Sequence, residues 1–138
     1  MALVKPSLRE LRDLLQRPLN TVQECGDAAF TLVQQGAAST VAISMGEQGA
    51  VLAHRDGVWH APALEVPATT GTTGAGDCFL AALVWALEHG DTPPEALRWG
   101  VAAGTAALLS PGTALAQAAD IHRLHAQVPV PQVITVAR

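Results

Sequence analysis

The first part of this sequence that could do chemistry is a glycine-rich segment that ends in a carboxylate. Residues 68–79 read ATTGTTGAGDCF, and they lead through Asp77 into the apolar run FLAALVWAL. A glycine-rich turn that enters a helix exposes backbone N–H groups without intrahelical partners, and the helix dipole adds partial positive charge there. This combination binds anions, and phosphate in particular. The segment therefore predicts an anion site at the start of a helix.

Asp77 itself has two interpretations that the glycine loop alone leaves open. A carboxylate in the first helical turn could take a proton from a substrate hydroxyl while the loop amides hold the charge on a transferring phosphoryl group. Alternatively, Asp77 only favours the start of the helix, as acidic residues often do. Two other phosphate loops are excluded, because no lysine lies near the segment and Phe79 stands where the dinucleotide-binding motif needs its third glycine.

Two further motifs have both a structural and a functional interpretation. Residues 44–49, SMGEQG, end a β-rich run, and they form either a plain glycine turn or a loop that lines a nucleotide. Residues 5–10, KPSLRE, contain Ser7 and Glu10 at the spacing of a helix capping box. The functional alternative gives Lys5 a phosphate group and Glu10 a hydrated magnesium ion, since magnesium keeps several waters and takes few carboxylates.

These motifs need a framework of strands and helices to bring them together. Apolar periodicity and turn residues predict strands at residues 3–4, 40–44, 50–54, 58–61 and 133–136. They predict helices that begin at residue 8 and that cover residues 22–35, 76–89, 91–109 and 117–127. Strands that alternate with helices indicate an α/β fold with a layered sheet. In this fold we expect Trp85 and Trp99 to lie in the core.

Composition and charge exclude several classes of function. The chain has 138 residues, 49% of them hydrophobic, which fits one domain over residues 1–138 with a core of its own. The net charge is −4 and no run of Lys or Arg occurs, so neither nucleic acid nor an anionic membrane is an expected partner. The longest apolar runs, 79–87 and 101–109, are too short to cross a bilayer. Cys25 and Cys78 match no metal or redox spacing, so we expect a cytoplasmic protein with reduced thiols.

In this order along the chain, the motifs resemble the C-terminal half of a PfkB-type carbohydrate kinase of the ribokinase superfamily. TTGAGDCF resembles the C-terminal signature of that family, and SMGEQG and KPSLREL resemble its nucleotide loop and its Lys-Pro-Asn-x-x-Glu-Leu segment. The stretch RWGVAAGTAALLSPGTAL is most similar to the branch that phosphorylates fructose 6-phosphate, fructose 1-phosphate or tagatose 6-phosphate. The resemblance covers residues 4–128. It implies part of a three-layer ribokinase-like α/β fold, with a sheet flanked by helices, whose N-terminal half and lid are missing.

The resemblance also implies roles for individual residues. The catalytic base would be Asp77, with an anion hole formed by the backbone of Gly74, Ala75 and Gly76. The residues that would contact ATP are Lys5, Ser44, Gly46, Gly49, Ala103 and Ala107. Glu10 would help to organise Mg2+, and K+ would bind near the carbonyls of residues 71–73 and 110–112. The substrate would be a sugar phosphate.

The sequence departs from the family pattern at three points. Ser7 stands where the family prefers Asn, and Gly71 stands where Asp or Ser is usual before Thr-Thr. The chain also begins as though inside a domain, and an open sheet edge would pair with a second copy or with an N-terminal half. The competing hypothesis is therefore a truncated, non-catalytic nucleotide-binding fragment. A third hypothesis is a kinase with another acceptor, such as a nucleoside or a vitamin alcohol.

Overall fold

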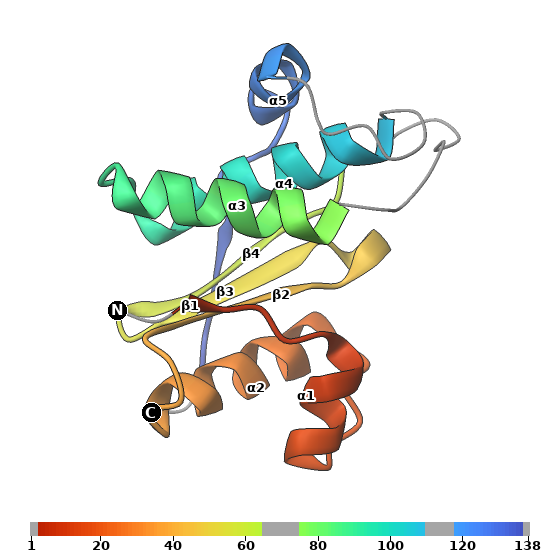
Figure 1. Cartoon of the computed structure of the whole chain (residues 1–138). Coiled ribbons are helices and arrows are strands. Elements are labelled where there is room, and N and C mark those ends of the chain that lie inside the picture. The colour runs from red at the N-terminus through yellow and green to blue at the C-terminus, as the bar shows by residue number, and fades with distance from the viewer. Residues whose placement is uncertain (1–2, 65–74, 110–117, 137–138) are drawn as a thin grey trace.

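A mixed sheet of five strands forms the central layer of the described structure (Figure 1). The computed structural model describes residues 3–64, 75–109 and 118–136. The strand order follows the sequence, and β1 pairs in parallel with β2 while the other neighbours pair antiparallel. The strands are β1 (Leu3–Val4), β2 (Thr40–Ser44), β3 (Ala50–His54), β4 (Gly57–Ala61) and β5 (Gln132–Ile134).

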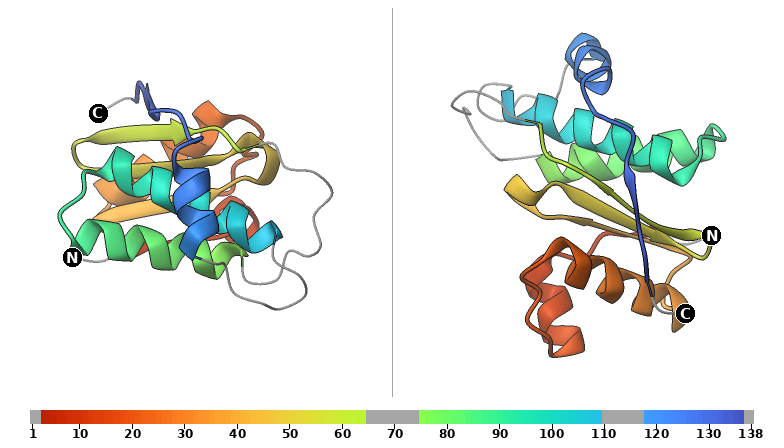
Figure 2. Two further views of the ribbon diagram at one scale, coloured as in Figure 1. Left: turned by 90° about the horizontal axis from the view of Figure 1, so that it is seen from above. Right: turned by 180° about the vertical axis from the view of Figure 1, so that it is seen from behind.

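Helices cover both faces of this sheet (Figures 1 and 2). On one face lie α1 (Leu8–Leu15) and α2 (Val22–Gln34). On the other lie α3 (Ala75–Glu88) and α4 (Pro93–Leu109), and α5 (Ala118–His125) packs on the outer side of α4. This arrangement is the layered α/β fold that the sequence predicts. In the described part of the chain, none of these helices has the length and apolar character needed to cross a lipid bilayer.

The alternation of side chains along the strands builds two separate cores. Val41 of β2 belongs to the core under α1 and α2, whereas Ala42 belongs to the core under α3 and α4. In β3, Val51 and Leu52 divide between the two cores in the same way, and all four side chains are fully buried. The same alternation places Ser44, at the end of β2, on the side of α3 and α4.

Two glycines of α4 let α3 pack closely against it. A Cβ at Gly100 would lie 3.0 Å from two ring atoms of Phe79 and 3.1 Å from Cγ of Leu83. A Cβ at Gly104 would lie 3.4 Å from the carbonyl oxygen of Ala75. Protein interiors are close-packed, so the missing side chain at Gly100 allows the observed separation of the two helices. This contact holds the first turn of α3 against the middle of α4.

The predicted strands and helices are all present, with ends that differ by one or two residues. The prediction for Trp85 is wrong, because its side chain is 54% exposed and its ring stacks on His89. Helix α3 packs inward through Phe79, Leu83 and Ala86, which recur at helical spacing, and Trp85 lies outside this stripe. The sequence of α3 is apolar on nearly every side, so it does not reveal which side is buried.

Candidate active site

A cleft of about 950 Å³ opens between one end of the sheet, α3 and α4. Its walls come from segments that are far apart in the sequence. The turn after β2 contributes Ser44, Gly46 and Gly49, and the first turn of α3 contributes Ala75 and Gly76. The fold therefore brings the predicted nucleotide loop and the described part of the predicted anion hole to one cleft.

The turn after β2 is held by its own backbone. The amide of Met45 donates to the carbonyl of Gly49 at 2.7 Å, and the amide of Gly49 donates to the carbonyl of Gly46 at 3.0 Å. Gly46 and Gly49 have φ angles of +59° and +88°, which residues with side chains rarely adopt. A Cβ at Gly49 would also overlap the carbonyl oxygen of Ala61, whereas a Cβ at Gly46 would meet no atom within 4 Å. Gly49 thus lets the turn approach the end of β4, and Gly46 leaves the backbone accessible from the cleft.

Lys5 lies beside the first turn of α3. Its ammonium nitrogen is 3.3 Å from the position that a Cβ on Gly76 would take, and it is the only lysine in the sequence. The first amides of an α-helix have no intrahelical acceptor, and the helix dipole adds partial positive charge to them. The ammonium group and the backbone of Ala75 and Gly76 therefore suit an anion such as phosphate.

Three predicted parts of this region lie outside the described residues. They are Gly74 of the anion hole and the two segments of the expected cation site, residues 71–73 and 110–112. Their roles stay predictions.

Asp77 follows Gly76 in the first turn of α3, and its side chain is exposed. It does not line the cleft itself, but it stands next to Gly76, which does. Among the described residues, no hydrogen bond or ion pair occupies its carboxylate. A carboxylate in this position can accept a proton from a hydroxyl that approaches the anion site from solvent.

Glu10 and Ser7 form the capping box that their spacing predicts. The amide of Ser7 donates to Oε1 of Glu10, and the amide of Glu10 donates to Oγ of Ser7, both at 3.1 Å. The hydrogen bonds from the backbone and side chain of Ser7, together with the charge of Lys5, lower the pKa of Glu10 although burial acts in the opposite direction. The described residues contain no group of three or more His, Cys, Asp and Glu side chains that could hold a metal ion. A magnesium ion near Glu10 would therefore depend on water and phosphate oxygens.

The wall formed by α4 consists of Gly100, Val101, Gly104, Thr105 and Leu108. These positions recur every three or four residues and share one side of the helix. Ala103 and Ala107, the predicted adenine contacts, are buried and do not line the cleft. The contact of these two alanines with adenine therefore stays a prediction.

Two other features of this region, one in the cleft and one behind the turn, have no sequence signal. Ala63 and Leu64 line it only because the chain leaves β4 beside Gly49. In addition, Nε2 of His60 in β4 lies 2.7 Å from the carbonyl oxygen of Gln48 in the turn. The sequence around His60 does not indicate this contact, because the fold decides which turn lies beside the end of β4.

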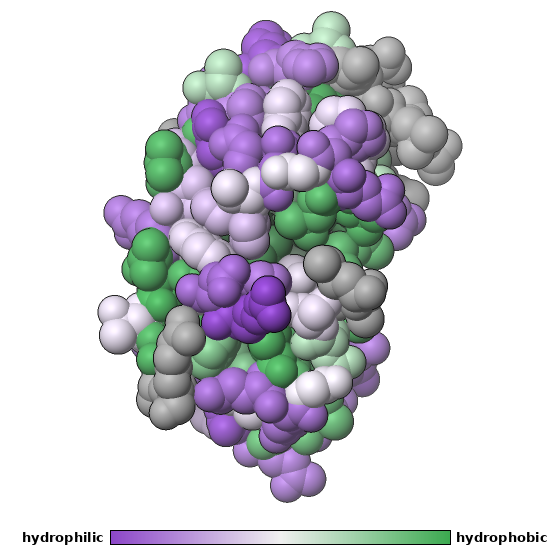
Figure 3. Space-filling view, turned by 90° about the vertical axis from the view of Figure 1, so that its left-hand side faces the viewer, coloured by the Kyte–Doolittle hydropathy of each residue, from purple (hydrophilic) through white to green (hydrophobic). Residues whose placement is uncertain are grey.

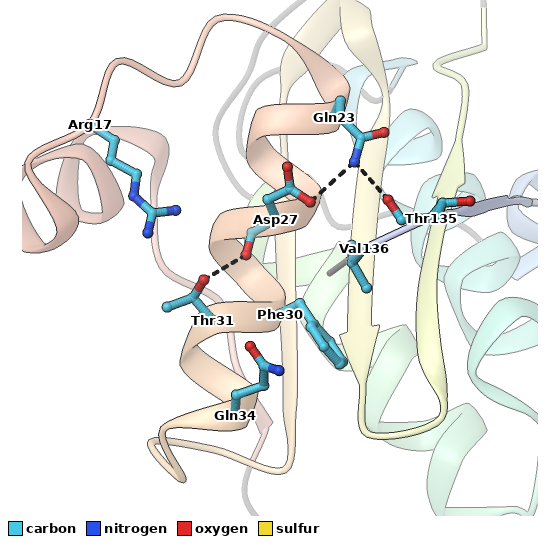
Figure 4. A pocket seen from close by; sticks show the side chains of 8 residues that line it. All are labelled: Arg17, Gln23, Asp27, Phe30, Thr31, Gln34, Thr135 and Val136. Atoms are coloured by element: carbon cyan, nitrogen blue, oxygen red, sulfur yellow. Dashed lines mark hydrogen bonds between the residues drawn. The ribbon is translucent and has the colours of Figure 1, made fainter. Parts of the chain in front are cut away.

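A second depression, of about 440 Å³, lies along α2 (Figure 4). The side-chain amide of Gln23 links α2 to the segment after β5 at this depression. Its Nε2 donates to Oδ1 of Asp27 at 3.1 Å and to the carbonyl of Thr135 at 2.9 Å. The guanidinium of Arg17 also borders it. Since α2 covers the opposite face of the sheet, this depression contains none of the predicted site residues, and the cleft beside α3 is the candidate active site.

Comparisons with known proteins show the family of this chain. The family described as pfkB family carbohydrate kinase matches residues 1–120. The ATP-dependent 6-phosphofructokinase isozyme 2 of Mycobacterium tuberculosis is 40% identical over 121 residues, which are 88% of this chain and 35% of that protein. The 1-phosphofructokinase of Borreliella burgdorferi is 31% identical over 133 residues, which are 96% of this chain and 42% of that protein. The chain thus spans about two fifths of the length of these relatives.

Solved structures support the same fold. A crystal structure of phosphofructokinase-2 from Escherichia coli in complex with substrates and products has a TM-score of 0.85 and 34% identity, covering 91% of this chain and 40% of that one. Ribokinase from Thermotoga maritima has a TM-score of 0.72 and 25% identity, covering 88% and 41% of the two chains. The expected ribokinase-like arrangement is therefore confirmed for the part of the fold that this chain covers.

Proposed function

Because this chain belongs to the pfkB family of carbohydrate kinases, we propose that it supplies the ATP site, the anion hole and the catalytic base for phosphorylation of a sugar-phosphate hydroxyl. The observation that carries the proposal is the single cleft where residues 44–49, the start of α3 and one face of α4 meet. The motifs that resemble the kinase family thus converge in space although they are dispersed in the sequence.

The proposed nucleotide site follows the length of this cleft. Ser44, Gly46 and Gly49 offer a hydroxyl and accessible backbone at one wall. The α4 wall is formed by glycine and mostly apolar side chains, which suit the flat apolar faces of an adenine ring. Lys5 and the first turn of α3 provide positive charge for the phosphates. ATP would supply the phosphoryl group when bound.

Asp77 and the backbone of the anion hole have different roles in the proposed reaction. The carboxylate of Asp77 takes the proton from the acceptor hydroxyl, so that this oxygen can bond to the transferred phosphorus. The amides of Gly74, Ala75 and Gly76 hold the negative charge that develops during transfer. The exposed position of Asp77 next to Gly76 supports this division of roles.

Glu10 is the proposed contact for magnesium. Its lowered pKa keeps the carboxylate ionised, and an ionised carboxylate can hold a hydrated Mg2+ through water. For K+ the proposal relies on the family resemblance and on residues 71–73 and 110–112. One crystal structure of E. coli phosphofructokinase-2 is a complex with potassium.

The proposed acceptors are fructose 6-phosphate, fructose 1-phosphate and tagatose 6-phosphate. The names of the relatives, 6-phosphofructokinase and 1-phosphofructokinase, support the first two. Because the chain spans about two fifths of those relatives, most contacts with the sugar would come from the part that they contain in addition.

An open surface supports association with such a part. Strand β1 stands at the edge of the described sheet, and an unpaired edge offers backbone groups to another strand. Val4 in this strand is 38% exposed, and Trp85 of α3 is 54% exposed. Figure 3 shows apolar side chains among polar ones on one face of the molecule. The proposed partner of this sheet edge is the N-terminal half of the kinase or, in its absence, a second copy of the chain.

A second candidate function is a non-catalytic nucleotide-binding fragment, and the open sheet edge is the observation that favours it. Calorimetry with ATP and Mg2+, together with a kinase assay on both fructose phosphates, separates the candidates. Phosphoryl transfer by this chain alone would eliminate the non-catalytic fragment. ATP binding without transfer would favour it, and the absence of ATP binding would remove both.

A further inference from the structure

His60 supports the turn of residues 45–49 from the side opposite to the cleft. In the β3–β4 pairing, His60 stands opposite Val51, and the side chains of such a pair lie on the same face of the sheet. Val51 belongs to the core under α1 and α2. The imidazole therefore lies on that face, whereas the cleft lies on the face of α3 and α4.

The contact between His60 and the turn is a directed hydrogen bond. Nε2 of His60 lies 2.7 Å from the carbonyl oxygen of Gln48. A carbonyl oxygen only accepts, so Nε2 carries the hydrogen and donates it. The bonds from Gln48 to Met45 and from Gly49 to Gly46 are internal to the turn. The bond from His60 instead attaches the turn to the sheet.

We propose that His60 is a positioning residue that fixes the turn in the conformation that receives the nucleotide, an inference that rests on the proposed ATP site. Two of the five residues of the turn are glycines with positive φ. Glycine has more accessible backbone conformations than other residues, so ordering the turn costs more conformational entropy. A bond that orders the turn in advance lowers the entropy that ligand binding must overcome. His60 acts on the nucleotide through the turn and does not touch it.

The test compares the ligand-free chain with His60→Ala and His60→Gln by amide hydrogen exchange followed by NMR. We expect the amides of Met45, Gln48 and Gly49 to exchange severalfold faster in His60→Ala. His60→Gln should restore slow exchange, because its side-chain amide can donate to the same carbonyl. Calorimetry should show that ATP binds about threefold to tenfold more weakly to His60→Ala, which corresponds to the loss of one ordinary hydrogen bond.

His54→Ala is the matched control. His54 lies at the opposite end of the same pair of strands, where it faces Asp56. Its replacement should leave both the exchange of the turn and ATP affinity unchanged. Unaltered exchange of the turn in His60→Ala would overturn the inference whatever happens to ATP. Faster exchange with wild-type ATP affinity would overturn it as well. If the wild-type chain binds no ATP, the proposed function fails, while faster exchange with rescue by Gln still supports His60 as the residue that holds the turn.

Discussion

The ammonium nitrogen of Lys5 lies 3.3 Å from the point where a Cβ on Gly76 would stand. Lys5 comes from the segment between β1 and α1, and Gly76 from the first turn of α3. The fold therefore places the only lysine of the chain at the start of a helix, where the first backbone amides have no acceptor within the helix. The absence of a side chain at Gly76 keeps the lysine and these amides close together.

Replacement of Lys5 by Met tests this arrangement. The variant keeps most of the unbranched side chain and removes its charge, so it should weaken ATP binding by about tenfold to a hundredfold, the usual effect of a hydrogen bond to a charged group. Calorimetry with ATP and Mg2+ measures the change. Arg9→Met removes an exposed positive charge from α1 and should change the affinity little. Equal effects of the two substitutions would show that only the net charge of the chain matters.

Gly49→Ala should destabilise the fold far more than Gly36→Ala. Both glycines have positive φ, but a Cβ at Gly49 would overlap the carbonyl of Ala61, whereas one at Gly36 meets no atom within 4 Å. Gly36→Ala should therefore cost only the backbone strain, about 1–2 kcal/mol. Gly49→Ala adds a steric clash with the backbone and should exceed about 3 kcal/mol. Urea unfolding measures both values, and similar losses would contradict the observed packing of the turn against β4.

Acid should weaken the contact between α4 and α5 through Glu95. Its carboxylate accepts from Nε2 of His125 at 2.7 Å and from Nη1 of Arg98 at 3.1 Å. Burial acts to raise the pKa of Glu95, but the hydrogen bonds and charges of His125 and Arg98 prevail and lower it below 4.5. Because the folded-state pKa is the lower one, the contribution to stability is present above about pH 4.5 and is lost as the pH falls through the folded-state value.

The Glu95→Gln variant tests this pH dependence. Between about pH 7 and about pH 3, its free energy of unfolding should fall less than that of the wild type, because the titrating group is gone. Glu88→Gln, at the exposed end of α3, is the control and should follow the wild type. A Glu95→Gln curve parallel to the wild-type curve would refute the role of this carboxylate.

Much of the fold could be predicted because local rules and the final structure agree. The capping box at Ser7 and Glu10 and the strands β2 and β3 depend on neighbours in the sequence, and the structure has them as predicted. The side of α4 that lines the cleft could not be read in this way, since alanines and glycines occur around much of the helix. Which of them face the cleft depends on the packing of Phe79 against Gly100.

In the candidate site, too, local motifs could be predicted from the sequence, whereas contacts between distant segments could not. The motifs around Lys5, Gly46 and Gly76 were predictable as separate segments, and the structure brings them together. The link from His60 to Gln48 was not predictable, because it depends on where β4 ends relative to the turn.

The role of Asp77 as catalytic base at an ATP site is tested by the turnover of an Asp77→Asn variant. The measurement uses this chain fused to the N-terminal part of a phosphofructokinase relative, with fructose 6-phosphate and fructose 1-phosphate as acceptors. We expect kcat to fall by about 10²–10⁴, the usual contribution of a positioned base, while ATP affinity stays near that of the unsubstituted fusion. A near-normal kcat of the Asp77→Asn fusion would rule out Asp77 as the base and leave it as a residue that only favours the start of α3.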